Sequence, residues 1–359
     1  MRFQFKTSYD DDINLFKDRY QAFWYLLLIV AAAAFPFVLD NYRLGEVVYV
    51  LILAIAGMGL MILAGHTGQP SLGHAAFLAC GAYMEAWLNN QGWPFLLSLP
   101  IAGLFAGLVG ALIAIPALRM SGIYLAIATL AMGIVAEDVI VLLEPWTGGV
   151  GGTTVGDILL PGMTVDRYAN PHAFYWLCLA LAVLIAFAYR NLLRSSTGRA
   201  FVAIRDSEVS AKAMGINLAR HKTLSFFLSC FVTGIAGALY AHYLGAFNYE
   251  AFLITLSIQM LLMIVVGGMG SIHGAFFGAM VIGFLPQFIT AIRQQITLHA
   301  IPGLDTGIFA AILIAILIIE PLGIYGQWVK TRIWLELFPL ARRDLFRRQR
   351  SYLKTERLR

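Results

Sequence analysis

The sequence predicts an all-α polytopic membrane protein with about ten transmembrane helices and with the N- and C-termini in the cytoplasm. The 359 residues are 60% hydrophobic and 13% charged, whereas soluble domains are about 45–50% apolar and about 25% charged. Apolar runs of about 20 residues, the length of a helix that crosses a bilayer, recur along the chain. A β-barrel would instead show segments of roughly 10 residues with alternating polarity, and the sequence shows none.

Ten apolar segments follow one another along the chain, and each is expected to form a helix. They cover residues 22–39, 47–64, 71–88, 94–116, 123–143, 173–189, 223–245, 255–269, 272–292 and 305–325. Segments 71–88 and 255–269 are the least regular, because Gly-rich stretches interrupt them. In the stretch 233–241, TGIAGALYA, small residues four apart predict close helix packing.

The distribution of Lys and Arg orients these spans. Loop 190–222 holds seven such residues and the tail 327–359 holds ten, whereas loop 144–172 holds only Arg167. Because basic loops stay in the cytoplasm, we expect the first loop and the tail inside and loop 144–172 outside. Ten spans with an internal N-terminus satisfy all three placements. The expected organisation is a cytoplasmic segment 1–21, a transmembrane domain 22–325, which includes both of these loops, and a basic cytoplasmic tail 326–359.

Composition excludes several classes of function. The net charge of +5 does not indicate nucleic-acid binding, because the basic residues lie in loops and in a tail beside the lipid bilayer. The three cysteines, Cys80, Cys178 and Cys230, match neither a disulfide framework nor a metal site. The sequence contains no HExxH, GxSxG, CxxC or P-loop pattern. We therefore expect no catalytic residue, no metal and no cofactor bound by this chain.

Three acidic residues, Glu85, Glu137 and Asp138, fall inside expected spans. Acids within a membrane are candidates for a proton relay. A hydrogen bond between helices, or at the interface with the headgroups, is at least as good an interpretation of these three.

Two Gly-rich stretches interrupt spans at corresponding places in two loosely repeated halves: LAGHTGQPSLGHAAFLACGAY at 63–83 and VVGGMGSIHGAFFGAM at 265–280. Non-helical backbone at membrane depth is tolerated only where protein packs it or a wet cavity adjoins it. Paired interruptions point to a substrate path, and close packing of small residues is the alternative. The candidate path residues are Gly65, Thr67, Gly68, Gln69, Ser71, His74, Gly267, Gly268 and Gly270.

The cytoplasmic stretch SSTGRAFVAIRDSEVSAKAMGINLARHK covers 195–222. Asp206 as N-cap and Gly215 at the C′ position predict a short helix over 207–214. Glu208 and Lys212 are expected to form an i,i+4 pair on it.

This short helix has an apolar edge of Val209, Ala213 and Met214, which suggests docking in a groove of a cytoplasmic partner. Small residues would let the partner approach closely. The candidate coupling residues are Gly198, Arg199, Arg205, Asp206, Glu208, Ala211, Lys212 and Gly215.

The external stretch TGGVGGTTVG covers 147–156. It is either a flexible connector, or a gate or docking surface for an outside partner. The candidate residues are Thr147, Gly148, Gly149, Gly151 and Gly152.

Five stretches resemble, in order, motifs of the branched-chain amino acid permease family of bacterial ABC importers, specifically its M-type membrane subunit. They are GHTGQPSLGHAAFLACGAY, PALRMSGIYLAIATLAMG, TGGVGG, GRAFVAIRDSEVSAKAMGI and VVGGMGSIHGAFFGA. The resemblance implies a multi-pass protein of the bacterial inner (plasma) membrane. It also implies a second permease subunit, two cytoplasmic ABC ATPases that use the ATP, and an external substrate-binding protein. The 195–222 stretch corresponds to the family's coupling segment.

The chain departs from the family pattern at Ser210 and Lys212, where alanine and an acid are common, which puts pairing with a generic ATPase in doubt. Gln69-Pro70 stands where urea-type relatives more often have Leu-Leu, which favours branched-chain or related amino acids as cargo over urea, short amides or aromatic acids. Two hypotheses of a different class compete with an ABC permease. One is a secondary transporter driven by H⁺ or Na⁺, and the second is a membrane scaffold that does not transport.

Overall fold

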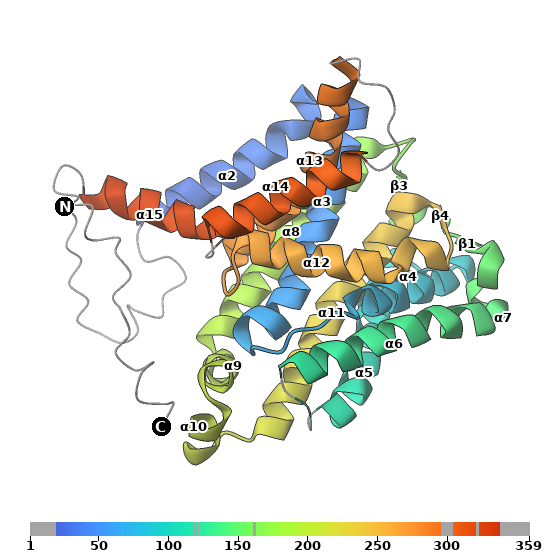
Figure 1. Ribbon diagram of the computed structural model, residues 1–359. Helices are drawn as coiled ribbons and strands as arrows, with labels where there is room; N and C mark the ends of the chain where they lie inside the picture. Colours follow the sequence, from blue (N-terminus) through green and yellow to red (C-terminus); the bar gives the residue numbers. More distant parts are fainter. Residues whose placement is uncertain are drawn as a thin grey trace.

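The computed structural model describes residues 19–117, 120, 122–160, 163–295, 304–320 and 323–337, most of which are helical (Figure 1). Its longer helices are α2 (Arg19–Val38), α3 (Asn41–Leu60), α4 (His74–Asn90), α5 (Phe95–Ala117), α6 (Ile123–Leu142), α8 (Pro171–Arg194), α11 (Leu218–Leu244), α12 (Ile254–Gly267), α13 (Ile272–Gln295), α14 (Leu304–Ile319) and α15 (Gly323–Leu337). The shorter helical elements are η1 (Met61–His66), α7 (Glu144–Thr147), η2 (Gly149–Gly151), α9 (Ser196–Asp206), α10 (Glu208–Ala213) and η3 (Tyr249–Phe252).

Each of the ten predicted apolar segments coincides with a helix. Within the described residues, 7 helices are long and apolar enough to cross a membrane, or 8 if α14 and α15, bent by 46°, count as one span. A multi-pass helical membrane protein is therefore confirmed. The count of ten is not, because the apolar part of α2 is short and α4 has only 17 residues. α15 also begins at Gly323 and crosses the expected boundary between domain and tail.

Two short antiparallel strand pairs depart from the all-α prediction. β1 (Thr153–Thr154) pairs with β4 (Ala246–Phe247), and β2 (Ile158–Leu160) pairs with β3 (Met163–Val165). The first pair joins the long loop after α6 to the loop after α11. Strands of two or three residues are too short to show a pattern of alternation, so the sequence does not predict them.

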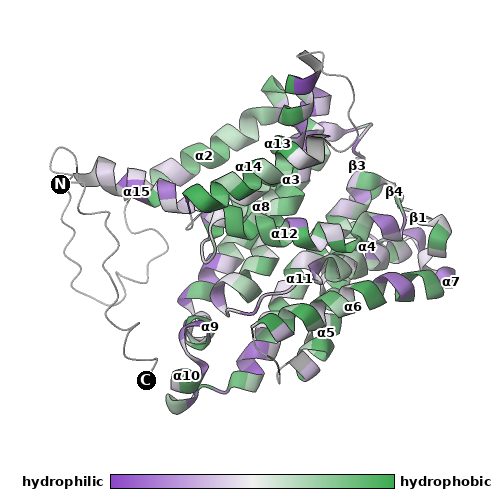
Figure 2. Cartoon of the chain, viewed as in Figure 1, coloured by the Kyte–Doolittle hydropathy of each residue, from purple (hydrophilic) through white to green (hydrophobic). Residues whose placement is uncertain are grey.

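Loops 190–222 and 144–172 lie at opposite ends of the bundle. α8 connects them directly, with Pro171 at one end and Arg194 at the other, and its 24 residues span about 36 Å at about 1.5 Å per residue. In Figure 1, α9 and α10 lie at the lower left, whereas α7, β1 and β4 lie at the right. Figure 2 shows mostly hydrophobic membrane-length helices and a more mixed surface on α9 and α10.

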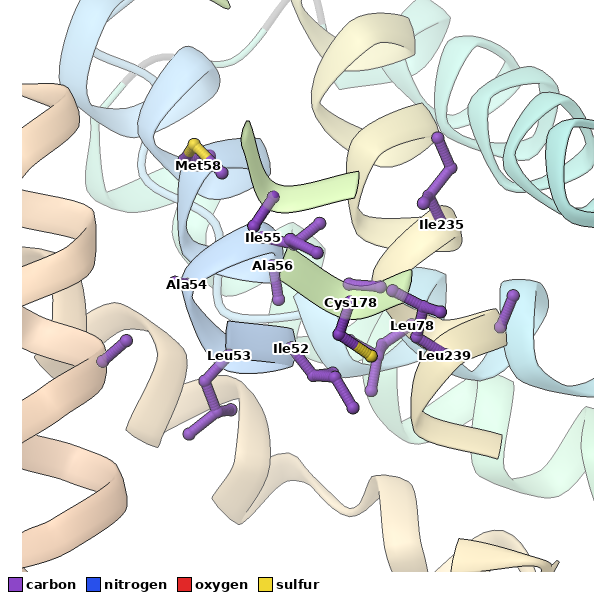
Figure 3. Packing of buried hydrophobic residues seen from close by; sticks show 14 of the residues in the cluster. Ile52, Leu53, Ala54, Ile55, Ala56, Met58, Leu78, Cys178, Ile235 and Leu239 are labelled. Atoms are coloured by element: carbon purple, nitrogen blue, oxygen red, sulfur yellow. The ribbon is translucent and has the colours of Figure 1, made fainter. Parts of the chain in front are cut away.

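α3 is the central helix of the core. Its side chains meet those of α4, α8 and α11 in one buried cluster, which includes Ile55, Leu78, Cys178 and Leu239 (Figure 3). α3 also packs against α12 and α13. The run 47–64 has no charged residue, and this allows α3 to be enclosed on several sides.

The predicted close packing of stretch 233–241 is confirmed. A Cβ atom added at Gly234 would lie 2.5 Å from the Ala106 Cβ atom on α5, and one added at Gly237 would overlap the Leu78 carbonyl oxygen on α4. Only glycine lets α11 approach its neighbours this closely.

Candidate functional site

The two predicted Gly-rich interruptions meet in space. The first lies between η1 and α4, and the second lies between α12 and α13. A Cβ atom added at Gly65 would lie 3.0 Å from the Gly270 backbone nitrogen, and that nitrogen donates to Met61 Sδ at 3.1 Å. Gly68, Gly268 and Gly270 have φ angles of 71°, 114° and 85°, which disfavour residues with a side chain.

A serine precedes the helix after each interruption. Ser71 Oγ is 2.9 Å from the side-chain Nδ1 of His74, whereas Ser271 Oγ accepts from the Gly274 backbone N–H at 2.8 Å. Nε2 of the same His74 ring is 2.9 Å from Ser229 Oγ. In both places the serine contacts the residue three positions later, which supports the prediction that the two interruptions correspond.

The predicted path residues are packed against protein in this conformation. Ser71 and His74 have no exposed surface, and Thr67 and Gln69 are 3% and 5% exposed. Thr67 Oγ1 donates to the Ile62 carbonyl at 3.0 Å. Gly267 fits so closely to the Gly274 carbonyl that a Cβ atom there would overlap it. Their role in a substrate path stays a prediction.

At the junction where the two interruptions meet, several buried polar atoms have no hydrogen-bond partner among the described residues: both ring nitrogens of His66, Oε1 of Gln69 and the Tyr189 hydroxyl. The rings of His66 and Tyr189 are 5.6 Å apart and nearly perpendicular. Buried polar groups normally find a partner. The junction therefore contains buried hydrogen-bond donors and acceptors that no described residue pairs with.

One side chain of the stretch 195–222 contacts both interruptions. Arg205, near the end of α9, donates from Nη1 to the Gly65 carbonyl oxygen at 3.1 Å. A Cβ atom at Gly68 would lie 2.9 Å from Arg205 Cγ, and one at Gly270 would lie 3.4 Å from Nη1. The cation also lies at the negative end of the α3–η1 helix. Arg205 therefore joins the stretch 195–222 to both broken helices, which are far from it in sequence.

The predicted N-cap at Asp206 is wrong. α9 extends through Asp206, so this residue is helical, and its carboxylate pairs with Arg205 at 3.1 Å. Ser207 is the N-cap of α10 instead, and its hydroxyl accepts from the Ser210 N–H at 3.3 Å. The sequence does not separate the two positions, because aspartate and serine are both good caps.

The predicted pair of Glu208 with Lys212 is also wrong. Glu208 pairs with Lys222 at 2.8 Å, and the Lys222 side chain is only 6% exposed. Lys212 lies exposed in the last turn of α10. The first turns of α11 pack close to α10 in the fold. Lys222, on α11, therefore forms the ion pair with the Glu208 carboxylate.

The predicted apolar edge of α10 is exposed, whereas one of the predicted coupling residues is not. Ala211 is completely buried, so it is not a docking contact, whereas Val209 and Met214 are 82% and 68% exposed. The C′ position of Gly215 is confirmed. Its φ angle is 84°, and the Ile216 N–H donates to the Ala211 carbonyl at 3.0 Å, the Schellman pattern.

The remaining candidates of this stretch serve α9 itself. Gly198 packs on the backbone of Leu192 and Leu193, and its N–H donates to the Ser195 cap at 3.2 Å. Arg199 donates from Nη1 to the Arg194 carbonyl at 2.9 Å. α9 is anchored by Phe201 and Ile204, which are buried.

The Gly-rich stretch 147–156 forms an ordered turn. Thr147 Oγ1 donates to the Ile140 carbonyl at 2.6 Å and accepts from the Gly149 N–H at 3.1 Å. Gly148, Gly149 and Gly152 have positive φ angles. Gly152 lies against the Phe247 carbonyl, whereas Gly151 faces open space. Its role as a gate or docking surface stays a prediction.

Two of the three membrane acids make hydrogen bonds between elements. Glu137 Oε1 accepts from the Ile254 N–H at 3.1 Å, at the start of α12. Glu85 Oε1 accepts from Ser98 Oγ at 2.7 Å and lies 3.1 Å from His242 Nε2. These contacts are the hydrogen bonds between elements that the sequence allows for both residues, and they do not test a relay.

A family model described as branched-chain amino acid transport system / permease component matches residues 42–319, which include both interruptions and the whole of α9 and α10. The chain belongs to this permease family.

Three relatives illustrate its range. The high-affinity branched-chain amino acid transport system permease protein LivM of Escherichia coli K12 is 33% identical over 70% of this chain and 64% of its own length.

The probable branched-chain amino acid transport permease protein LivH of Methanocaldococcus jannaschii is 25% identical over 80% of this chain and 93% of its own. The autoinducer 2 import system permease protein LsrC of Salmonella paratyphi B is 25% identical over 77% of this chain and 79% of its own. The chain thus spans a little under two thirds of the Escherichia coli LivM relative and more of these two. No solved structure matches this chain.

Proposed function

We propose that this protein is the membrane permease subunit of an ATP-driven ABC importer for branched-chain or related amino acids. Its own helices form part of the translocation path, and separate cytoplasmic ATPases supply the energy. The single observation that carries the proposal is the contact of Arg205 with Gly65. Through it, a cytoplasmic helix pair reaches the two broken helices of the membrane domain.

The proposed coupling runs through α9 and α10. An ATPase docks on the exposed edge formed by Val209 and Met214. Movement of α10 is transmitted to α9, and Arg205 then shifts the interruptions against each other. The buried polar atoms of His66, Gln69 and Tyr189 would gain partners when the junction opens to water or polar cargo.

The proposed assembly contains a second permease subunit, two ABC ATPases and an external substrate-binding protein, in a bacterial inner membrane. The chain crosses the membrane about ten times with both termini and loop 190–222 inside. Single cysteines at Ser196 and Thr154, in a background without native cysteines, should label from opposite sides of intact cells. Labelling of both from outside would exclude this topology.

The experiment that tests the function is uptake by proteoliposomes containing the complete complex. Leucine uptake should require ATP and an intact ATPase, and should survive a protonophore. Uptake that a protonophore stops while ATP lasts would instead favour a secondary transporter. One relative is named as a permease for autoinducer 2 and not for an amino acid, so the cargo of this protein needs its own test. Unlabelled leucine, urea and acetamide are therefore compared as competitors of labelled leucine. Strong competition by urea or acetamide, without competition by leucine, would assign urea or short amides as the cargo.

A further inference from the structure

A cavity of about 400 Å³ lies at the end of the bundle opposite α9 and α10. It is formed by the first turns of α3 and α8, the last turn of α11 and part of α13. On α3 it includes Glu46, 19 residues before Gly65, which is roughly 30 Å along a helix. It is therefore separate from the junction at Arg205. Its volume falls in the range of small-molecule sites.

Arg167 is held rigidly in this cavity. Its Nη1 donates to the Tyr243 carbonyl at 2.8 Å, and its Nη2 donates to the Tyr243 hydroxyl at 3.2 Å. Its guanidinium carbon lies 3.8 Å from the centre of the Tyr243 ring and 5.4 Å from that of Tyr168. Among the described residues these bonds use two of the five N–H groups of the guanidinium, which leaves three for a ligand.

A glycine of α3 lies beside this cation. A Cβ atom at Gly45 would lie 3.6 Å from Arg167 Nη2, which is an ordinary van der Waals contact, so the guanidinium packs directly against this turn of α3. A planar guanidinium fixed in this way is suited to hold a carboxylate through two parallel hydrogen bonds.

Glu46 supplies the opposite charge in the same cavity. No salt bridge among the described residues joins Glu46 to Arg167 within 4.0 Å, so the two charges face one space without neutralising each other directly. Phe174, Pro171 and Val48 add apolar surface to the lining. A cation, an anion and an apolar wall in one small cavity match the three parts of an aliphatic amino acid.

We propose that this cavity is an outer binding subsite for a zwitterionic α-amino acid. The Arg167 guanidinium binds the carboxylate, and the Glu46 carboxylate binds the ammonium group. The apolar wall contacts the aliphatic side chain, and Tyr168 and Tyr243 flank the guanidinium. The inference rests on the proposed function, because it takes the cargo to be an amino acid. It adds a position where cargo is recognised by its charges before it reaches the helix interruptions.

The test uses the two permease subunits with their two ATPases in phosphatidylcholine nanodiscs. The substrate-binding protein is left out, so that it does not bind the ligands itself. Saturation-transfer NMR measures binding of leucine, of 4-methylpentanoate, which lacks the ammonium group, and of 3-methylbutylamine, which lacks the carboxylate. Glu46→Gln should weaken leucine binding about tenfold, the size expected for one charge-assisted hydrogen bond, and leave 4-methylpentanoate binding unchanged. Arg167→Gln should weaken leucine and 4-methylpentanoate and leave the amine unchanged.

Arg43→Gln and Glu250→Gln are matched controls, because both residues are exposed and neither lines the cavity. Both should bind leucine normally. Arg167 also anchors the loop, so Arg167→Gln could disturb assembly. In that case the subsite is judged from the leucine affinity of two milder variants. Glu46→Gln is nearly isosteric, and Arg167→Lys keeps the positive charge.

Unchanged leucine affinity in Glu46→Gln would overturn the subsite. So would a leucine signal that disappears when phosphatidylethanolamine replaces phosphatidylcholine, because the cavity would then hold a lipid headgroup. Leucine uptake is measured with the same complexes in proteoliposomes, with the substrate-binding protein added, because nanodiscs enclose no volume. Normal uptake with unchanged affinities contradicts this inference alone, whereas no leucine uptake by the unaltered complex contradicts the proposed function.

Discussion

Replacement of Glu208 by glutamine should loosen α10, whereas the same change at Lys212 should not. Glu208 pairs with Lys222, whose side chain is 6% exposed while that of Glu208 is 42% exposed. Breaking a fully buried pair costs about 3–5 kcal/mol and an exposed one about 0.2–1 kcal/mol. For this half-exposed pair we expect about 1–2 kcal/mol, or roughly a tenfold increase in local opening. Lys212→Gln removes only an exposed charge near a helix end, about 0.3–0.5 kcal/mol.

The assay is hydrogen exchange of the backbone amides of 208–216, measured by mass spectrometry on the complete transporter. Glu208→Gln should accelerate exchange about tenfold, and Lys212→Gln about twofold at most. The double change Glu208→Lys with Lys222→Glu should restore part of the protection. Equal exchange in the two single variants would refute the reasoning, because it would mean that Lys222 contributes no more than a surface charge.

Three further substitutions test neighbouring parts of the molecule. Gly215→Val should destabilise the end of α10 by about 1–2 kcal/mol, because the φ angle of 84° disfavours a β-branched residue. The ATPase is proposed to dock on α10, so less ATPase should copurify with this variant, and normal copurification would contradict the prediction. Val209→Glu should detach the ATPase at unchanged thermal stability, since the side chain is 82% exposed, and a stable complex would show that docking occurs elsewhere. Gly237→Val should abolish accumulation of the protein in membranes because its Cβ would overlap the Leu78 carbonyl, whereas Gly151→Val, which faces open space, should accumulate normally on immunoblots.

Features that depend on local pattern could be predicted from the sequence. Apolar runs of about 20 residues marked the helices because a bilayer demands that length. Glycine marked the places where the backbone leaves the helix, and both Gly68 and Gly270 have positive φ angles. Gly215 was found because a helix end in the left-handed conformation nearly requires glycine.

Features that depend on long-range contact could not be predicted in this way. Arg205 and Gly65 are 140 positions apart, and nothing in either stretch indicates the other. Glu208 has a suitable partner at i+4 in Lys212, and no local pattern shows that the tertiary partner Lys222 lies closer. Ala211 shows the same limit, because an alanine fits a buried and an exposed helix position equally well, and only the fold distinguishes them.

Whether Arg205 transmits ATPase motion to the broken helices can be measured as the ratio of leucine uptake to ATP hydrolysis in Arg205→Met. Methionine keeps much of the side-chain length and removes the bond to the Gly65 carbonyl. Arg199→Met is the control, because Arg199 lies on the same helix and, among the described residues, its side chain bonds only the nearby Arg194 carbonyl. We predict that Arg205→Met keeps its ATPase and its hydrolysis, while uptake per ATP falls at least about tenfold, as expected for loss of a hydrogen bond to a charged group. A normal ratio in Arg205→Met, equal to that of Arg199→Met, would contradict a coupling role for Arg205.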